Sequence, residues 1–303
     1  MAAAVELIAA PWNLGLRPSA PGREPGTWRA PQALLSAGLA TLLRPARVVQ
    51  LDRPPYEFDP QPATRIRNGV TIREHSLRLA EVVRDALAAD RFPVVLGGDC
   101  SILLGCLLGA RYAGRCGLLH LDGHNDFRHP GRHDTGADLG AAAGMDLALA
   151  TGRGELLLAH WPVAGRPLVA DEDVVQIGDR EDGEVLPVAR FTAREIGRLG
   201  IAGLAERVID RLERRALDRS WLHLDLDVLD ERVLPAVDSP GRPGLDFAQL
   251  AELVAALVGT GRVAGLDVAV YDPERDPDGA HAAPIAECLA AALSALTATE
   301  AHA

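Results

Sequence analysis

The sequence predicts a single α/β domain over residues 1–303, built on a sheet of mostly parallel strands that helices cover. Short apolar or β-branched runs, each bounded by turn residues, alternate along the chain with longer stretches rich in Ala, Leu, Arg and Glu. This alternation is typical of repeated βα units. A length of 303 residues also suits one large open sheet with a continuous core. No repeat, low-complexity segment or linker-like change of composition divides the chain.

The expected elements follow from the length and periodicity of the apolar runs. Predicted strands are residues 5–9, 47–51, 93–96, 117–121, 174–177, 221–226 and 263–270. Predicted helices carry apolar residues three and four positions apart and are residues 72–89, 102–112, 204–217, 247–258 and 282–296. Two loops, residues 18–27 and 131–144, each follow a strand. Ligands of open parallel sheets bind beyond the carboxyl ends of strands, so these loops are candidate walls of a site.

The charge balance narrows the class of partner. With 31 basic and 42 acidic side chains, the net charge is -11, which argues against nucleic acid or an anionic membrane and favours a small-molecule substrate. The first residues do not have the pattern of a secretory leader, and no apolar run approaches the roughly 18–20 residues that cross a bilayer. Four cysteines form no CxxC pair. We therefore expect a cytoplasmic protein without a disulfide framework.

The first acidic segment is LLHLDGHNDFRH, in which an apolar strand leads into Asp122, His124 and Asp126. Alternate residues of an extended chain point the same way, so these side chains can converge on one cation. Carboxylate oxygens with one imidazole nitrogen suit Mn²⁺, Zn²⁺ or a similar ion. Taken alone, the segment also fits a polar turn with surface charges.

The second acidic segment is SWLHLDLDVLDERV, which places Asp225 and Asp227 at the same alternating spacing after another apolar strand. Burying two carboxylates without compensation costs several kcal/mol each. If both acidic strand ends bind the same metal ions, the cations compensate the buried negative charge of both. The pair of segments therefore favours a metal site over two unrelated polar turns.

A third segment, FPVVLGGDCSILLG, ends a strand with two glycines, which permit a close backbone approach, before Asp99 and Cys100. The residues leave two interpretations of Cys100 open. It is either a soft metal ligand or a buried structural thiol.

These motifs, in this order, resemble those of the ureohydrolase family of arginases, agmatinases and formiminoglutamases. GGDCS stands in place of GGDHS, LDGHND in place of a DAHxD core, and DLDVLDERVLPAVDSPGRPGL completes the pattern. The similarity covers nearly the whole chain, from APWNLGLRPSAPGREPGTWRAPQALLSAGL to GLDVAVYDPERDP. The resemblance implies a three-layer α/β/α sandwich around a mostly parallel sheet of about eight strands, with a pair of Mn²⁺ ions at the carboxyl ends of the strands.

The resemblance also implies the ligand sets. One ion would bind Cys100, Asp122, Asp126 and Asp225, and the other Asp122, His124, Asp225 and Asp227. A hydroxide held between the ions would attack a planar guanidine, amidine or amide carbon, because two cations lower the pKa of water toward neutrality. Asp126 would orient this nucleophile by accepting its hydrogen bond.

Two departures from the family pattern bear on the metal and on the substrate. Cys100 stands where the family has a metal-binding His, so the first position is expected to hold its ion weakly, to prefer Zn²⁺ over Mn²⁺, or to hold none. Val270 stands where guanidine-hydrolysing members have a Glu that pairs with the substrate's guanidinium. An isopropyl group leaves that cation unpaired, so arginine itself is not the expected substrate.

The position of the proton shuttle also differs. Ala143 precedes Gly-Met where the family often has a His. His133, with its neighbour His129, is the candidate replacement, and a solvated loop histidine is the alternative interpretation of both.

Three further residues are candidates for contacts with the substrate. Arg128 falls where arginase-like members have an Asn at the carboxylate end of the substrate, and an Arg there would suit an anion or simply lie on the surface. Glu181 and Asp182 lie near the acids that bind the substrate's ammonium group in the family.

The leading hypothesis is a metal-dependent hydrolase of a linear C–N bond in a guanidino, amidino, formimino or amide compound other than arginine. It would use one or two Mn²⁺ ions, or Zn²⁺, and family members commonly form homo-oligomers. The alternative is a non-catalytic or regulatory homologue that keeps the metal site for structure or for binding a small ligand. The retained ligands favour the hydrolase; the changes at Cys100, Ala143 and Val270 favour the alternative.

Overall fold

Eight strands form one sheet in which every pair of neighbours is parallel. The computed structural model describes residues 3–128, 139–162, 167–181 and 185–297. Across the sheet the order is β2 (Arg47–Gln50), β1 (Ala4–Ala10), β3 (Arg91–Gly97), β8 (Val263–Ala269), β7 (Ser220–Asp225), β4 (Gly117–Leu121), β5 (Val174–Ile177) and β6 (Ala189–Phe191). The predicted parallel α/β sheet is confirmed.

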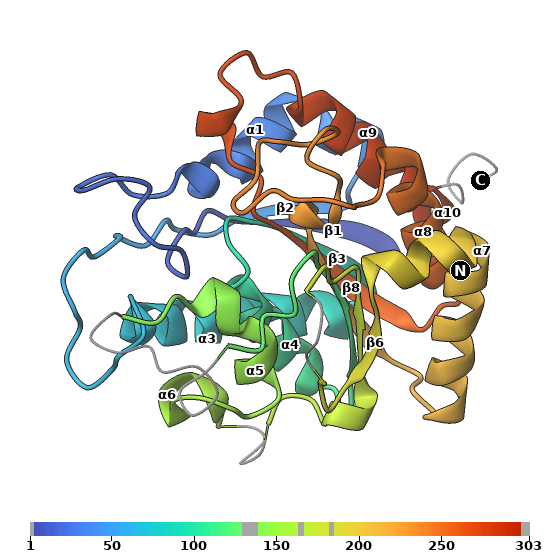
Figure 1. The fold of residues 1–303 in the computed structure, drawn as a ribbon, viewed down its shortest axis with the longest axis horizontal. Coiled ribbons are helices and arrows are strands. Elements are labelled where there is room, and N and C mark those ends of the chain that lie inside the picture. The colour runs from blue at the N-terminus through green and yellow to red at the C-terminus, as the bar shows by residue number, and fades with distance from the viewer. Residues whose placement is uncertain (1–2, 129–138, 163–166, 182–184, 298–303) are drawn as a thin grey trace.

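Helices cover both faces of this sheet, as Figure 1 shows. One layer contains α3 (Gly69–Ala88), α4 (Ile102–Arg111), α5 (Asp146–Ala150) and α6 (Leu156–Ala159). The other contains α1 (Ala30–Ser36), α2 (Leu39–Leu43), α7 (Ala193–Arg214), α8 (Phe247–Gly259), α9 (Ala282–Ala292) and α10 (Ser294–Thr297). The result is the three-layer α/β/α sandwich that the family resemblance implies.

Local sequence accounts for the starts of the two longest helices in the second layer. Thr192 caps α7 and Asp246 caps α8, each through a capping box with the residue three positions on. The structure extends α7 eleven residues before the predicted start at residue 204 (204 − 193 = 11). Gly200, with a φ of 69°, interrupts the helix and its apolar periodicity, so the pattern revealed only the second part.

The strand predictions differ from the structure mainly at the edges. β6 was not predicted, because its three residues, Ala189–Phe191, are only half-buried and carry no long apolar run. β8 ends at Ala269, one residue before the predicted limit. Val270 has a φ of 64°, a left-handed conformation that a β-branched residue rarely adopts and that ends the strand.

The core lies on both faces of the central strands. Every residue of β4 and of β7 is buried, as expected for a parallel sheet covered on both sides. Two of these buried residues are histidines, His120 on β4 and His223 on β7, and the strand register pairs them directly. Polar side chains thus enter the middle of the sheet at these imidazoles, and also at the fully buried Gln176 of β5 and Asp267 of β8.

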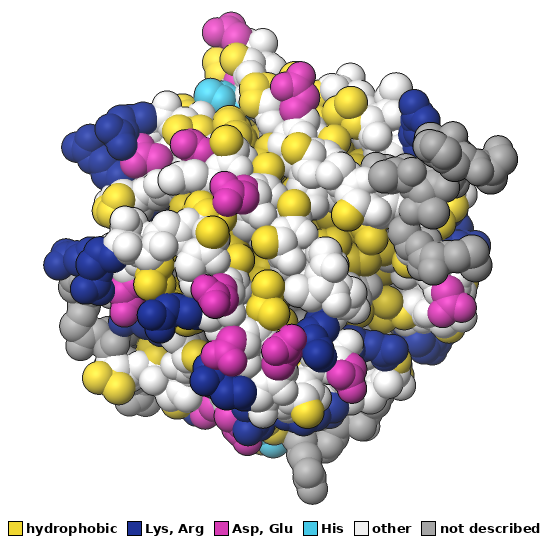
Figure 2. Space-filling view, turned by 90° about the vertical axis from the view of Figure 1, so that its right-hand side faces the viewer, with side chains coloured by type: hydrophobic (Ala, Val, Ile, Leu, Met, Phe, Trp, Pro, Cys, Tyr) yellow, Lys and Arg dark blue, Asp and Glu magenta, His cyan; other side chains and the backbone are white. Residues whose placement is uncertain are grey.

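The surface carries charges of both signs. Figure 2 shows acidic and basic side chains interspersed over the face that forms the right-hand side of Figure 1. Surface charges also pair along helices: Arg214 Nη2 lies 2.5 Å from Asp210 Oδ2, one turn earlier in α7. None of the described helices combines the length and apolar character that a bilayer crossing requires.

Candidate metal centre

Two acidic side chains stand at the carboxyl ends of paired strands. Asp122 directly follows β4, and Asp225 is the last residue of β7. The register that pairs Leu121 with Leu224 brings both carboxylates to the same edge of the sheet. The position is therefore fixed by main-chain pairing and does not depend on flexible loops.

The turn between β3 and α4 delivers Cys100 to this edge. Gly98 permits the turn, because a Cβ atom there would lie 1.5 Å from the carbonyl oxygen of Trp12. Asp99 then accepts backbone hydrogen bonds from Gly15 at 3.0 Å and Ser101 at 2.8 Å, which fixes the loop after β1 against this turn. The Cys100 thiol donates to Asp225 Oδ2 at 2.8 Å.

His124 joins the two acidic segments. Its Nδ1 lies 2.8 Å from Asp227 Oδ2 and 3.7 Å from Asp122 Oδ1. One ligand atom from each of these three residues falls within 4.8 Å of the other two. A single cation can therefore contact all three.

The charges at this edge are unbalanced. Burial raises the pKa of Asp225 well above its usual range, and the charges of Asp227 and Asp122 raise it further. The pKa of Asp126 is raised in the same way, by burial and by Asp122. Carboxylates this close do not all ionise unless a cation neutralises them.

Among the side chains at this edge, His124 is a source of positive charge beside Asp122 and Asp227. Partial burial lowers its pKa, but contacts with Asp122 and Asp227 outweigh this effect and raise the pKa to about 11. Burial alone would raise the pKa of Asp122, whereas the hydrogen bond with His124 and the charge of His120 lower it to about 2. His124 therefore carries a proton between Asp122 and Asp227, and a divalent ion that bound to these three residues would displace this proton.

A cavity of about 390 Å³ opens above these side chains. Its floor includes Cys100, His124, Asp126, Asp225 and Asp227. The expected wall residues of loop 18–27 contribute Pro18, Ser19 and Pro25. The described part of loop 131–144 contributes Ala141, Ala143 and Gly144. Both loops are therefore walls of this cavity, as the sequence predicts.

Comparison with known proteins decides the family. A profile described as "Arginase family" matches residues 3–295. The chain belongs to the arginase family. The arginase of Brevibacillus brevis is 37% identical over 187 residues, which are 58% of this chain and 60% of that protein. That of Staphylococcus aureus strain COL is 28% identical over 292 residues, 89% of this chain and 90% of the relative. The matches to the Brevibacillus brevis and Bacillus caldovelox proteins span less than two thirds of those relatives, 60% and 63%.

Solved structures agree with this family. The arginase of Bacillus caldovelox superposes with a TM-score of 0.82 at 26% identity and covers 96% of this chain and 98% of its own. The arginase of Entamoeba histolytica, at 21% identity and a TM-score of 0.81, shares the fold and covers 97% and 99%. The arginase-like fold is confirmed.

Three of the predicted substrate contacts of this arginase-family member lie around the cavity. Val270 is buried and lines it, and the backbone N–H of Val270 donates to the carbonyl oxygen of Gly98 at 2.8 Å. Arg128 also lines it, with 65% of its side chain exposed, and its Nη2 lies 3.4 Å from Glu181 Oε1. Asp182 and His133 lie outside the described residues.

Backbone strain collects around the same cavity. Asp126, Ser239 and Val270 all line it, and their φ angles of 45°, 49° and 64° are positive. Such conformations cost of order 1–3 kcal/mol each in non-glycine residues and persist where the surrounding structure imposes them. This strain points to the same place as the carboxylates.

Sequence reasoning missed three buried ionisable residues next to this centre: His120, Asp146 and His223. All three are 0% exposed. The available signal was the tetrapeptide Leu-His-Leu-Asp, which occurs at 119–122 and again at 222–225 and places a His two residues before a candidate ligand. The partner Asp146 follows Met145, which comes directly after Gly144, the last residue of the predicted loop.

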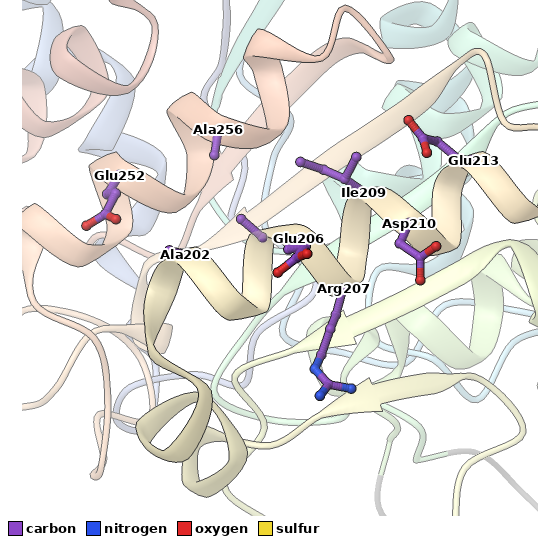
Figure 3. Close-up of a pocket in the computed structure, with 9 residues that line it drawn as sticks. Ala202, Glu206, Arg207, Ile209, Asp210, Glu213, Glu252 and Ala256 are labelled. Carbon is purple, nitrogen blue, oxygen red and sulfur yellow. The ribbon is translucent and has the colours of Figure 1, made fainter.

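A larger hollow of about 850 Å³ lies elsewhere, between α7 and α8 (Figure 3). Its charged lining side chains are Glu206, Arg207, Asp210, Glu213 and Glu252. These belong to helix surfaces, and its nine lining residues include neither His nor Cys. We assign no ligand to it, although it exceeds the cavity at the strand ends in volume.

Proposed function

We propose that this protein is a metal-dependent hydrolase of a linear C–N bond in a guanidino, amidino, formimino or amide compound. The observation that carries this proposal is that Asp122, His124 and Asp227 each bring a ligand atom within 4.8 Å of the other two, beneath a cavity that His124, Asp225 and Asp227 line. Membership of the arginase family supports the same reaction class. We also propose that residues 1–303 act as one domain, in the cytoplasm.

The residues at the cavity floor suit divalent ions. Asp122, His124 and Asp227, with Asp225, would hold one ion, and Cys100, Asp126 and the shared Asp122 and Asp225 would hold the other. The raised pKa values of Asp225 and Asp126 indicate negative charge that cations would compensate. Such ions would supply Lewis acidity and lower the pKa of a water molecule toward neutrality.

The identity of the ion depends on the side chains at each position. Oxygen ligands with one imidazole suit Mn²⁺ at the His124 position, whereas a thiolate suits Zn²⁺. Burial raises the pKa of the Cys100 thiol well above its usual range, and the thiol donates a hydrogen bond to Asp225. We therefore propose that the His124 position binds Mn²⁺ and that the Cys100 position binds an ion more weakly or selects Zn²⁺.

The chain's own residues have distinct roles in this proposal. Asp126 accepts the hydrogen bond of the attacking water and so orients it. We propose that Arg128, at the exposed rim, contacts an anionic group of the substrate, and that the roles of Glu181 and Asp182 are to bind its ammonium group. His133 carries the proton to the leaving amine, since Ala143 cannot.

We propose that arginine is not the substrate. Val270 lines the cavity where, by resemblance, a Glu would pair with a guanidinium, and an apolar side chain leaves that cation without a partner. A neutral amide, or a formimino or substituted guanidino compound, would not need this carboxylate. The names of the relatives, which are arginases, make this the sharpest point to test.

The test measures release of urea, ammonia or formamide from a panel of guanidino, formimino and amide compounds by protein loaded with Mn²⁺ or with Zn²⁺. We expect turnover of at least one non-arginine compound and none of arginine above the rate of Asp225→Asn. Efficient hydrolysis of arginine by the wild type would contradict the substrate assignment. Val270→Glu should raise arginine turnover at least tenfold, and Val270→Gln, of equal size without the charge, should not.

A second candidate function is a non-catalytic homologue that keeps its metal site for structure or ligand binding. Its specific support is the replacement of two family side chains at the cavity, by Cys100 and Ala143. In the same assay this candidate requires stoichiometric metal together with turnover equal to that of Asp225→Asn for every compound. We further propose a homo-oligomer, as is common in the family, which light scattering coupled to size-exclusion chromatography would measure.

A further inference from the structure

A second group of ionisable side chains lies in the core beside the carboxylate floor. His120 Nε2 is 3.2 Å from Asp146 Oδ1, and His223 Nε2 is 3.4 Å from Asp146 Oδ2. The two imidazole rings stack, with centroids 5.0 Å apart. One ligand atom from each of the three residues lies within 4.8 Å of the other two. We call His120, Asp146 and His223 the inner triad.

Asp267 fixes the orientation of the His223 ring through the ring nitrogen that points away from Asp146. His223 Nδ1 lies 2.5 Å from Asp267 Oδ2, and Asp267 Oδ1 accepts the indole N–H of Trp221 at 2.6 Å. A carboxylate that holds the Nδ1 proton leaves Nε2 as the ring nitrogen that can bind a metal. Metal-binding histidines have this arrangement, with a carboxylate on the nitrogen that does not bind the ion.

Several atoms of this region have no hydrogen-bond partner among the described residues. They include His223 Nε2 and Asp146 Oδ2, which lie 3.4 Å apart without forming a hydrogen bond, and Asp122 Oδ2; all three side chains are 0% exposed. Buried polar atoms are normally paired, because leaving one unpaired costs roughly 1–3 kcal/mol. An ion among them would satisfy these atoms together.

The separations suit tetrahedral coordination. Bonds of about 2.0–2.1 Å from a zinc ion to nitrogen or oxygen place neighbouring ligand atoms about 3.3–3.4 Å apart in a tetrahedron. The contacts of Asp146 with the imidazoles are close to this value, and each uses a different carboxylate oxygen: Oδ1 lies 3.2 Å from His120 Nε2, and Oδ2 lies 3.4 Å from His223 Nε2. A hydrogen-bonded imidazolium would give similar distances, so the experiment must separate the two.

We propose that the inner triad, His120, Asp146 and His223, binds a divalent ion of borderline softness, with Zn²⁺ as the best match. Two imidazole nitrogens and one carboxylate are a common zinc donor set. Cys100 and Asp122 each come within 4.8 Å of His223 and complete the surroundings of this inner site. The inference goes beyond the proposed function, because no triad residue belongs to the ligand sets assigned above.

The position explains why Cys100 borders two clusters. Its sulfur belongs to two groups of close ligand atoms, one with Asp122 and His223 and one with Asp126 and Asp146, and each group joins a residue of the inner triad to a residue of the proposed hydrolase site. A zinc ion in the inner site would lie nearer the core than the ion proposed at His124. Its role would be to hold Asp122 and Cys100 in place from behind, independently of turnover.

The first experiment counts zinc per chain after loading and dialysis. Asp146→Asn and His223→Gln should each lose about one zinc per chain relative to the wild type, whereas His124→Gln should keep that zinc. Asp173→Asn and His75→Gln, which also change buried side chains but lie outside both groups, should bind as the wild type does. Unchanged zinc in both triad variants would overturn the proposal.

The second experiment needs no variant and decides the matter if the triad variants do not fold. Anomalous diffraction at the zinc edge from wild-type crystals should show a peak about 2.0–2.2 Å from His120 Nε2, His223 Nε2 and Asp146. Peaks confined to Asp122, His124 and Asp227 would reject the inner site and indicate a buried imidazolium instead. A zinc peak at the triad with no turnover of any compound would reject the proposed hydrolase while leaving the inner site intact.

Discussion

The two ends of the sheet treat buried aspartates in opposite ways. At the amino end of β5, Asp173 accepts paired hydrogen bonds from Arg115 at 2.7 and 2.6 Å and from Arg215 at 3.0 and 2.9 Å. At the carboxyl end of β7, Asp225 accepts from the Cys100 thiol and from the Asp227 backbone N–H. Both carboxylates are buried, so burial alone does not distinguish them.

The pKa values record this difference. Burial would raise the pKa of Asp173, but its two arginines outweigh burial and lower it. Burial raises the pKa of Asp225, and the neighbouring carboxylates add to the rise. Asp173 has its counter-charge in the chain, whereas Asp225 leaves that charge to be supplied, as expected for a carboxylate that binds a cation.

Removing a carboxylate from the carboxyl end should have the largest effect. Asp225→Asn removes a ligand that both proposed ions share, so we expect ion binding to weaken by at least about 1,000-fold and turnover to be lost. The ion-free protein should remain folded, because the change removes charge repulsion. Metal analysis with circular dichroism measures both effects. Wild-type metal content in this variant would contradict the contrast between the two ends.

The pH should control ion binding at the carboxyl end. The ion must displace the proton of His124, whose pKa is about 11, and protons on Asp225 and Asp126, whose pKa values are raised. Apparent affinity should therefore rise with pH between about 6 and 8, by up to about tenfold per unit for each proton released.

The ion-free protein should show the opposite trend. A His pKa raised from 6.5 to about 11 stabilises the fold fully below pH 6.5, and this contribution is lost as the pH rises toward 11. Calorimetry in buffers of different ionisation enthalpy counts the released protons, and thermal unfolding of the ion-free protein gives the second trend. An affinity that does not change with pH would show that these groups are already deprotonated.

Removing the carboxylate at the amino end should change stability alone. Asp173→Asn removes the carboxylate that two arginines share. Because those side chains are 49% and 36% exposed, we expect a loss of about 2 kcal/mol, less than the roughly 3–5 kcal/mol of a broken pair that is fully buried. Denaturant unfolding measures it. Ion content should equal that of the wild type, and a loss of metal would mean that the two ends are not independent.

The smallest effect is expected at the rim of the cavity. Arg128→Ala removes a largely exposed side chain whose contact with Glu181 is 3.4 Å, so stability should change by less than about 0.5 kcal/mol. For a substrate with an anionic end, KM should rise about threefold to tenfold with little change in kcat. Equal KM values for anionic and neutral substrates would remove Arg128 from the substrate contacts.

The sequence by itself determined the class of fold, and it predicted that Asp122, Asp126, Asp225 and Asp227 belong to one site. Alternating apolar runs and helical periodicity predict a parallel sheet, because burying both faces of each strand requires continuous apolar segments. The sequence also predicts that Asp122 lies near His124 and Asp225 near Asp227, because residues two positions apart stay close. The extended alternation assumed in that prediction does not continue, since β4 ends at Leu121, β7 ends at Asp225 and Asp227 lies in the 3-10 turn Leu226–Val228.

Only the tertiary structure decided which of these residues meet and what lies beneath them. The pairing of β4 with β7 puts His120 opposite His223, and Asp146, the first residue of α5, contacts both imidazoles. Asp146 is 26 residues after His120 and 77 residues before His223 in the chain (146 − 120 = 26, 223 − 146 = 77). Strand register and helix packing set such contacts, and neither is encoded in the spacing of one segment. The same holds for Asp173, whose arginines come from two distant segments. The sequence alone therefore does not show whether a buried carboxylate is structural or binds a cation. The fold decides this, because it either places a basic side chain beside the carboxylate or leaves it without one.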